Sequence, residues 1–285
     1  MESRPELFPS VRFEPGFALR LERCVRARPR LAGLHEGRAP FAHASAGGEL
    51  VGLRAYRPGD DPRLLDWNAS ARSDHPIVRV LRPESGERWS LILDASASMG
   101  VGPPGKLQRA AEVAVAVAVH AARSGAEIEL CVEPSGARFC FVRRRPLAEL
   151  LSFLTRVRAE GVLADPAARS RGARRVIWIG DLAGLDPTRL LAARPRHAAL
   201  HVLQILAPHE FSGISGDFGP VAWWDPESDA GVEVDVDVAA LAHFERERTR
   251  SIDGWRRVLA HARAHHVCAT SARPFEELFA ALALP

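Results

Sequence analysis

Short apolar runs alternate with longer segments of helical period from about residue 87 onward. An uninterrupted apolar run bounded by polar residues is typical of a strand that is covered on both faces. Such runs predict strands over 88–94, 174–181, 198–206 and 266–270. Helical periodicity predicts helices over 106–124, 146–158, 187–193, 241–265 and 274–284. Strands that alternate with helices predict an α/β fold, with a doubly wound, mainly parallel sheet and right-handed crossovers.

Two segments within this region need separate treatment. In the segment 106–124, Val113, Val115, Val117 and Val119 alternate with alanine, which is a strand period. Its length and alanine content nevertheless favour a helix that is buried on more than one side. The segments 127–133 and 138–142 flank a turn-forming Pro-Ser-Gly-Ala sequence and therefore predict a β-hairpin.

The first 86 residues lack this alternation and predict a small irregular or β appendage, with the main domain spanning 87–285. Apolar residues at helical spacing predict a short amphipathic helix over 16–28. Residues 30–48 have no strong period and predict a loop or irregular strand. Residues 75–81 predict an edge strand, because Pro76 at its start costs no ladder hydrogen bond there.

Composition narrows the class of protein. A formal net charge of +3 over 285 residues does not indicate binding to nucleic acid or to an anionic membrane. The four cysteines lack the close pairs of a zinc site, which favours a reducing compartment. Residues 1–20 do not resemble a signal peptide, and the longest apolar stretch, 110–122, is too short to span a bilayer. We therefore expect a cytoplasmic protein.

The candidate chemistry lies where two predicted strands end. Asp94 ends the strand 88–94 and is followed by Ser96 and Ser98, while Asp181 ends the strand 174–181. Open α/β sheets bind ligands at the carboxyl ends of their strands. Carboxylate and hydroxyl oxygens suit Mg²⁺ or Mn²⁺ rather than zinc. By spacing alone, an equally good interpretation is a polar cluster that caps the following helix.

A nucleotide-binding enzyme is the competing hypothesis for the same region. Residues 100–106 have the spacing of a phosphate-binding P-loop ending in Lys106, the only lysine of the chain. Leu107 stands where Ser or Thr should hold Mg²⁺, and Pro103 and Pro104 lack the N–H groups that a phosphate cradle needs. A chance match in a Gly/Pro turn explains this spacing better than a degenerate P-loop does.

Two charged segments admit a functional and a structural interpretation. The segment 49–72 mixes charges of both signs with aromatic residues, so it is either a docking surface or a buried ion-pair network. We favour the network. The candidate partner-binding residues are Arg54, Asp60, Asp61, Arg63, Asp66, Trp67 and Arg72. The segment 225–237 carries six acidic residues and no basic one, and predicts a solvated hairpin or acidic loop that serves solubility rather than ligand binding.

Two sequence motifs resemble known families. Asp94-Ala95-Ser96-Ala97-Ser98 resembles the Asp-x-Ser-x-Ser metal-ion-dependent adhesion site of von Willebrand factor A domains, and Asp181 matches the distal aspartate of that family. Residues 54–72, which read RAYRPGDDPRLLDWNASAR, resemble the signature of a bacterial domain-of-unknown-function family (number fifty-eight). Members of that family are typically encoded beside MoxR-type AAA+ ATPases.

The resemblance implies a von Willebrand factor A-like fold and a non-enzymatic role as an adaptor. The implied partners are a MoxR-type AAA+ ATPase and a client protein that is remodelled or matured. The implied metal ligands are Asp94, Ser96, Ser98 and Asp181, with Mg²⁺ or Mn²⁺ bound. The family's usual threonine ligand is missing, because the loop 160–165 offers Leu163 and Ala164 instead. This difference weakens the expected metal site and leaves Asp165 as a substitute donor.

Overall fold

The computed structural model describes residues 10–27, 48–57, 60–83, 87–103, 105–163, 172–192, 194–212, 219–228 and 230–284. The chain divides into two compact units, one of residues 1–31 together with 87–285 and one of residues 32–86. The boundary near residue 87 coincides with the predicted domain boundary. The N-terminal helix α1 (Phe17–Ala27), however, belongs to the larger unit.

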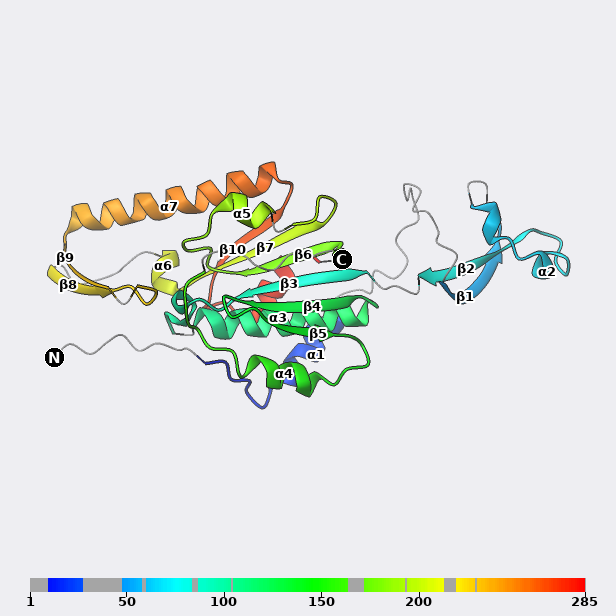
Figure 1. Ribbon diagram of the computed structural model, residues 1–285, viewed down its shortest axis with the longest axis horizontal. Helices are drawn as coiled ribbons and strands as arrows, with labels where there is room; N and C mark the ends of the chain where they lie inside the picture. The colour runs from blue at the N-terminus through cyan, green and yellow to red at the C-terminus, as the bar shows by residue number, and fades with distance from the viewer. Residues whose placement is uncertain are drawn as a thin grey trace. The chain divides into compact units, whose positions relative to one another are not determined.

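A six-stranded sheet forms the centre of the larger unit (Figure 1), with the strand order β10-β7-β6-β3-β4-β5. Its strands are β3 (Arg88–Asp94), β4 (Glu127–Glu133), β5 (Ala137–Phe141), β6 (Arg175–Gly180), β7 (Ala199–Leu206) and β10 (His265–Thr270). All neighbouring pairs are parallel except β4 and β5, which form the predicted antiparallel hairpin. The predicted α/β class with a mainly parallel sheet is confirmed.

Helices cover both faces of this sheet (Figure 1). They are α3 (Lys106–Arg123), α4 (Leu147–Leu154), α5 (Pro187–Ala192), α6 (Pro208–Ser212), α7 (Val238–His261) and α8 (Phe275–Ala281). Successive side chains of a strand point to opposite faces. Leu91 and Leu93 accordingly pack in the core cluster that contains α3, whereas Ile92 packs in the cluster that contains Trp255 and Leu259 of α7. Burial on both faces explains the continuous apolar runs in the sequence.

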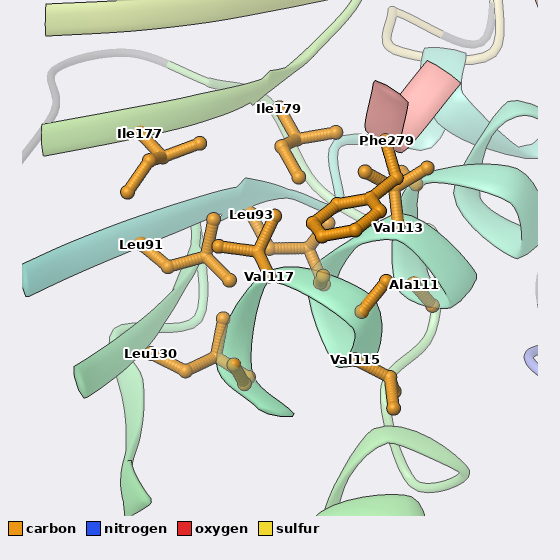
Figure 2. Packing of buried hydrophobic residues seen from close by; sticks show 14 of the residues in the cluster. Leu91, Leu93, Ala111, Val113, Val115, Val117, Leu130, Ile177, Ile179 and Phe279 are labelled. Carbon is orange, nitrogen blue, oxygen red and sulfur yellow. The ribbon is translucent and has the colours of Figure 1, made fainter. Parts of the chain in front are cut away.

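Helix α3 is the central helix of one face (Figure 2). Val113, Val115 and Val117 are all fully buried, as are the alanines between them. The helix contacts β3, β4 and β6 on one side and α1, α4 and α8 on others. The prediction of a helix buried on more than one side is therefore confirmed. The small alanine side chains let neighbouring elements approach this helix closely.

The smaller unit contains a two-stranded antiparallel ribbon of β1 (Gly48–Ala55) and β2 (Ile77–Pro83). A 3-10 helix (Pro62–Leu64) and a short helix α2 (Trp67–Ser70) lie between the strands in sequence. The predicted edge strand is confirmed as β2, but β1 was not predicted. A ribbon with Gly52, Leu53 and Arg54 exposed lacks the alternation of buried and polar positions that identifies a strand. The prediction for residues 30–48 lies almost wholly outside the described residues.

The acidic segment forms a hairpin, as predicted, of β8 (Gly219–Trp224) and β9 (Gly231–Val236) in the larger unit. Asp237 follows it and caps α7 by accepting a hydrogen bond from the backbone N–H of Ala240 at 2.7 Å. Among the described residues, no helix combines the length and apolar character needed to cross a membrane.

Candidate functional site

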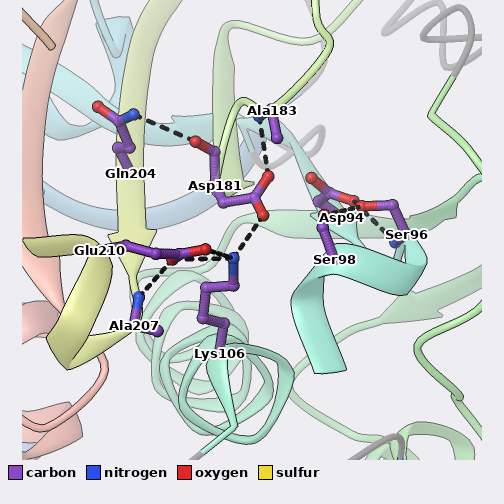
Figure 3. A network of polar contacts seen from close by, with 9 residues as sticks. All are labelled: Asp94, Ser96, Ser98, Lys106, Asp181, Ala183, Gln204, Ala207 and Glu210. Carbon is purple, nitrogen blue, oxygen red and sulfur yellow. Dashed lines mark hydrogen bonds and ion pairs between the residues drawn. The ribbon is translucent and has the colours of Figure 1, made fainter. Parts of the chain in front are cut away.

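The carboxyl ends of β3 and β6 bring the two predicted aspartates to one edge of the sheet (Figure 3). The strands pair in parallel with Leu93 opposite Ile179, so the residues that follow them emerge at the same edge. Asp94 is the last residue of β3, and Asp181 directly follows β6. Both side chains are buried. The predicted juxtaposition of the two acids is therefore present.

Gly180 allows Asp94 to lie against the backbone of β6. A Cβ atom at position 180 would be 2.5 Å from Cβ of Asp94 and 2.6 Å from its Oδ2. Real side chains do not approach that closely, so any other residue at this position would push Asp94 away. The glycine thus fixes how near the first acid can come to the strand that carries the second.

Asp94, Ser96 and Ser98 form one connected polar cluster. Oδ1 of Asp94 accepts hydrogen bonds from the backbone N–H of Ser96 at 2.9 Å and from its hydroxyl at 2.7 Å. The hydroxyls of Ser96 and Ser98 are 3.1 Å apart. The other oxygen, Oδ2 of Asp94, is buried and has no hydrogen-bond partner among the residues that the structure describes. A buried carboxylate oxygen without a partner is costly unless a cation or a proton satisfies it.

The capping interpretation does not account for this cluster. Ser96 stands at the N-cap of the 3-10 helix Ala97–Gly100, yet its side chain makes no capping hydrogen bond. Helix α3 begins after Gly105, which has no side chain to cap it. The serine hydroxyls therefore serve the polar cluster rather than a helix end.

Burial and charge both disfavour ionisation of Asp94. Burial raises the pKa of Asp94 to about 7, and the negative charge of Asp181 adds to the shift. The hydrogen bonds from Ser96 and the charge of Lys106 act in the opposite direction but are outweighed. A carboxyl group with this pKa gains or loses its proton near neutral pH.

Lys106 is the main residue of the site whose contacts the sequence analysis did not predict, since it considered this lysine only in the disfavoured P-loop hypothesis. Its ammonium group donates to Oδ2 of Asp181 at 2.8 Å and to the two carboxylate oxygens of Glu210 at 2.9 and 3.0 Å. The side chain is only 1% exposed. Burial alone would lower the pKa of Lys106, but the carboxylates of Asp181 and Glu210 outweigh it and raise the pKa. The lysine is a buried counter-ion.

This arrangement disfavours the P-loop hypothesis. A P-loop lysine must be free to reach a phosphate, whereas the ammonium group of Lys106 is held by three carboxylate oxygens of Asp181 and Glu210. The neighbouring carboxylates would also repel a phosphate group. The lysine's position at the start of α3 shows in the sequence, but its distant partner Glu210 does not.

The predicted metal ligands thus fall into two groups. Asp94, Ser96 and Ser98 offer oxygen donors, whereas Asp181 is engaged by Lys106 through Oδ2 and by the backbone N–H of Ala183 through Oδ1. Within the described part of the chain, no cluster of three or more His, Cys, Asp and Glu side chains is arranged to hold a metal.

The donor set of the first group fits a hard cation only if the serine hydroxyls take part. The unpartnered Oδ2 of Asp94 is its charged donor. In the loop where the family's threonine is expected, Leu163 is buried and apolar, while Ala164 and Asp165 lie outside the described residues.

Glu227 is a second site residue that sequence analysis missed. It lies in the turn between β8 and β9, close enough to Ser98 for that hydroxyl to lower its pKa. Burial raises the pKa of Glu227, with Asp181 and Asp225 adding to the shift. The acidic segment is therefore not fully solvated as predicted, because Glu227 is half-buried and lies near Ser98. The sequence could not reveal this contact, because Glu227 and Ser98 lie far apart along the chain.

The candidate partner-binding residues of the smaller unit are mostly exposed. Arg54 pairs with Asp60 at 2.7 Å, and this hydrogen-bonded pairing lowers the pKa of Asp60 to about 2. Asp61 caps the 3-10 helix through the N–H of Arg63, and Asp66 caps α2.

The two capping residues thus have local structural roles. Trp67 is 73% exposed, and Arg63 and Arg72 are exposed as well. Within the smaller unit, the described ion pair and caps are local and lie near the surface.

Comparison with known proteins places the chain in a family. A solved aerotolerance-related membrane protein from Bacteroides fragilis is 13% identical, covers 69% of this chain and 96% of its own, and has a TM-score of 0.38, too low to establish a shared fold. Uncharacterized proteins of Mycobacterium bovis and Mycobacterium tuberculosis are each 30% identical over 235 residues, which is 76% of this chain and 71% of each relative. The family model "Protein of unknown function DUF58" matches residues 52–253. The chain therefore belongs to the DUF58 family.

Proposed function

We propose that this protein is a non-enzymatic adaptor with a von Willebrand factor A-like fold, which binds a carboxylate of a partner protein through Mg²⁺ or Mn²⁺. The observation that carries the proposal is the buried Oδ2 of Asp94, which has no hydrogen-bond partner among the described residues, on a carboxylate whose Oδ1 accepts from Ser96. Asp94, Ser96 and Ser98 would hold the cation, and Asp181 would contribute its charge through space. The cation would supply a binding point for an incoming acid.

The fold supports this proposal. The polar cluster lies at the carboxyl edge of a mainly parallel sheet that has helices on both faces, which is where such sheets bind ligands. The serine hydroxyls are bonded to a carboxylate and to each other, and the described site residues include no histidine that could activate them. This composition favours binding over catalysis.

The partner is proposed from the resemblance of residues 54–72 and from the family. We propose a MoxR-type AAA+ ATPase as the partner, with an unidentified client protein, and a cytoplasmic location. The smaller unit offers a second candidate surface for the same partner that needs no metal. The exposed Trp67 favours this candidate, since large exposed aromatic side chains often anchor protein interfaces.

Calorimetric titration with Mg²⁺ and Mn²⁺ tests the metal-binding part of the proposal. We expect saturable binding by the wild type and its loss in Asp94→Ala, because that variant removes the charged donor. Asp235→Ala, which removes an exposed carboxylate on β9, is the matched control and should bind like the wild type. Equal heats for the wild type and Asp94→Ala would remove the cation from the proposed function.

A further inference from the structure

The β8–β9 hairpin carries one carboxylate into the polar cluster. Asp225 fixes the turn by accepting hydrogen bonds from the backbone N–H of Glu227 at 3.0 Å and from the hydroxyl of Ser228 at 2.6 Å. The Glu227 side chain is half-buried and lies close enough to Ser98 for that hydroxyl to lower its pKa. Its Oε1 atom is buried without a hydrogen-bond partner. The turn therefore holds an acid against the serine that ends the proposed metal-binding motif.

Two unpartnered carboxylate oxygens are consequently linked through the same serines. Oδ2 of Asp94 and Oε1 of Glu227 are both buried, and neither has a partner in the described part of the chain. Asp94 bonds to Ser96, Ser96 contacts Ser98, and Ser98 contacts Glu227. Each of these oxygens still needs a proton or a cation to satisfy it, and the two serines connect the acids that carry them.

The charge around the site also calls for a cation. Asp94, Asp181, Glu210 and Glu227 carry four negative charges when ionised, and Lys106 supplies one positive charge, which leaves a formal charge of −3. Burying such an excess is unfavourable unless protons or a cation neutralise it. Lys106 is paired with Asp181 and Glu210, so Asp94 and Glu227 must be neutralised by protons or by a cation.

We infer that Glu227 is an internal ligand of the divalent cation held by Asp94, Ser96 and Ser98. This inference rests on the proposed function, because it requires the cation, but it adds a ligand that neither the motif nor the family description contains. It replaces the missing threonine with a carboxylate from a different element. It also means that an acid from a partner must displace Glu227, so the hairpin regulates access to the metal.

Titration with Mn²⁺ alone, followed by calorimetry and by the electron paramagnetic resonance signal of free Mn²⁺, tests this inference. We expect Glu227→Gln to raise the Kd by about tenfold or more, since even outer-shell partners of a metal contribute that much. Glu233→Gln removes an exposed carboxylate from β9 of the same hairpin and should leave the Kd unchanged. Near-ultraviolet circular dichroism verifies that each variant is folded.

The other outcomes separate this inference from the proposed function. If the wild type binds Mn²⁺, Asp94→Ala does not, and Glu227→Gln binds like the wild type, Glu227 is no ligand and the proposed function stands. If Glu233→Gln weakens binding as much as Glu227→Gln, the effect comes from general hairpin charge and the inference is overturned. If the wild type binds no Mn²⁺, the acids share a proton instead, and both proposals fail.

Discussion

At the scale of single residues, the protonation state of His201 follows from its two neighbours. Its Nε2 is 3.0 Å from Nη1 of Arg175, and its Nδ1 is 3.1 Å from the carbonyl oxygen of Leu282. An arginine can only donate, so Nε2 must accept and Nδ1 must carry the proton. Burial, and then the charge of Arg175, lower the pKa of His201 to about 4. The folded protein therefore holds this histidine neutral.

This histidine should make the protein sensitive to acid. Its folded pKa of about 4 lies below the unfolded value of 6.5, so the unfolded chain takes up the proton first as the pH falls and stability is lost between these values. We expect a loss of about 2–3 kcal/mol by pH 4.5 from this group. Urea unfolding at pH 7 and pH 4.5 should show a smaller loss in His201→Gln. An equal loss in both proteins would contradict the assignment.

At the scale of elements, α3 shows what a fully surrounded helix requires. Its buried valines and alanines fill the space between the sheet and three other helices. Protein interiors pack densely, so small shifts of neighbouring side chains do not fill the cavity left when the two methyl groups of a valine are removed. The stability of this face of the sheet therefore depends on individual α3 side chains.

Shortening a side chain at the centre of α3 should have a measurable cost. We expect Val117→Ala to lower the free energy of unfolding by about 1–3 kcal/mol, because the cavity outweighs the better helix propensity of alanine. Leu19→Ala on α1 is the control: Leu19 is 65% exposed, so its change should stay within about 0.5 kcal/mol. Denaturant unfolding measures both. A cost for Val117→Ala no larger than the control's would mean that the helix is loosely packed.

The elements near the site also show where prediction from sequence succeeds. Strands β3 and β6 are buried on both faces, so their continuous apolar runs and terminal aspartates identified them and their shared edge. Lys106 and Glu227 could not be placed in the same way. Their partners Glu210 and Ser98 lie more than a hundred residues away in sequence, and no local period encodes such contacts. Strand β1 was missed because an exposed ribbon has no buried face to set a pattern.

At the scale of the whole molecule, the two compact units divide the candidate functions. The larger unit holds the polar cluster at the sheet edge, and the smaller one holds the exposed Trp67. Each unit can therefore be tested by substitutions within it. A residue that is largely exposed contributes little to folding, so its loss can be read as an effect on binding.

Trp67→Ala tests whether the smaller unit docks a partner. If it does, affinity for a purified MoxR-type AAA+ ATPase should fall by about thirtyfold or more, as expected for an interface anchor. The melting temperature should stay unchanged, because the side chain is 73% exposed. Surface plasmon resonance gives the affinity, with Leu19→Ala as a control in the larger unit. Unchanged affinity in Trp67→Ala would leave the smaller unit without this role.

The chain has a single lysine, and its side-chain amine is buried in the folded protein. Lys106 is 1% exposed and is bound to two acids, so an amine-directed label or cross-linker finds no lysine on the folded surface. Modification of this side chain requires the sheet edge to open first. The rate at which a lysine-reactive reagent modifies Lys106 would therefore report how often the sheet edge opens and exposes this side chain to water.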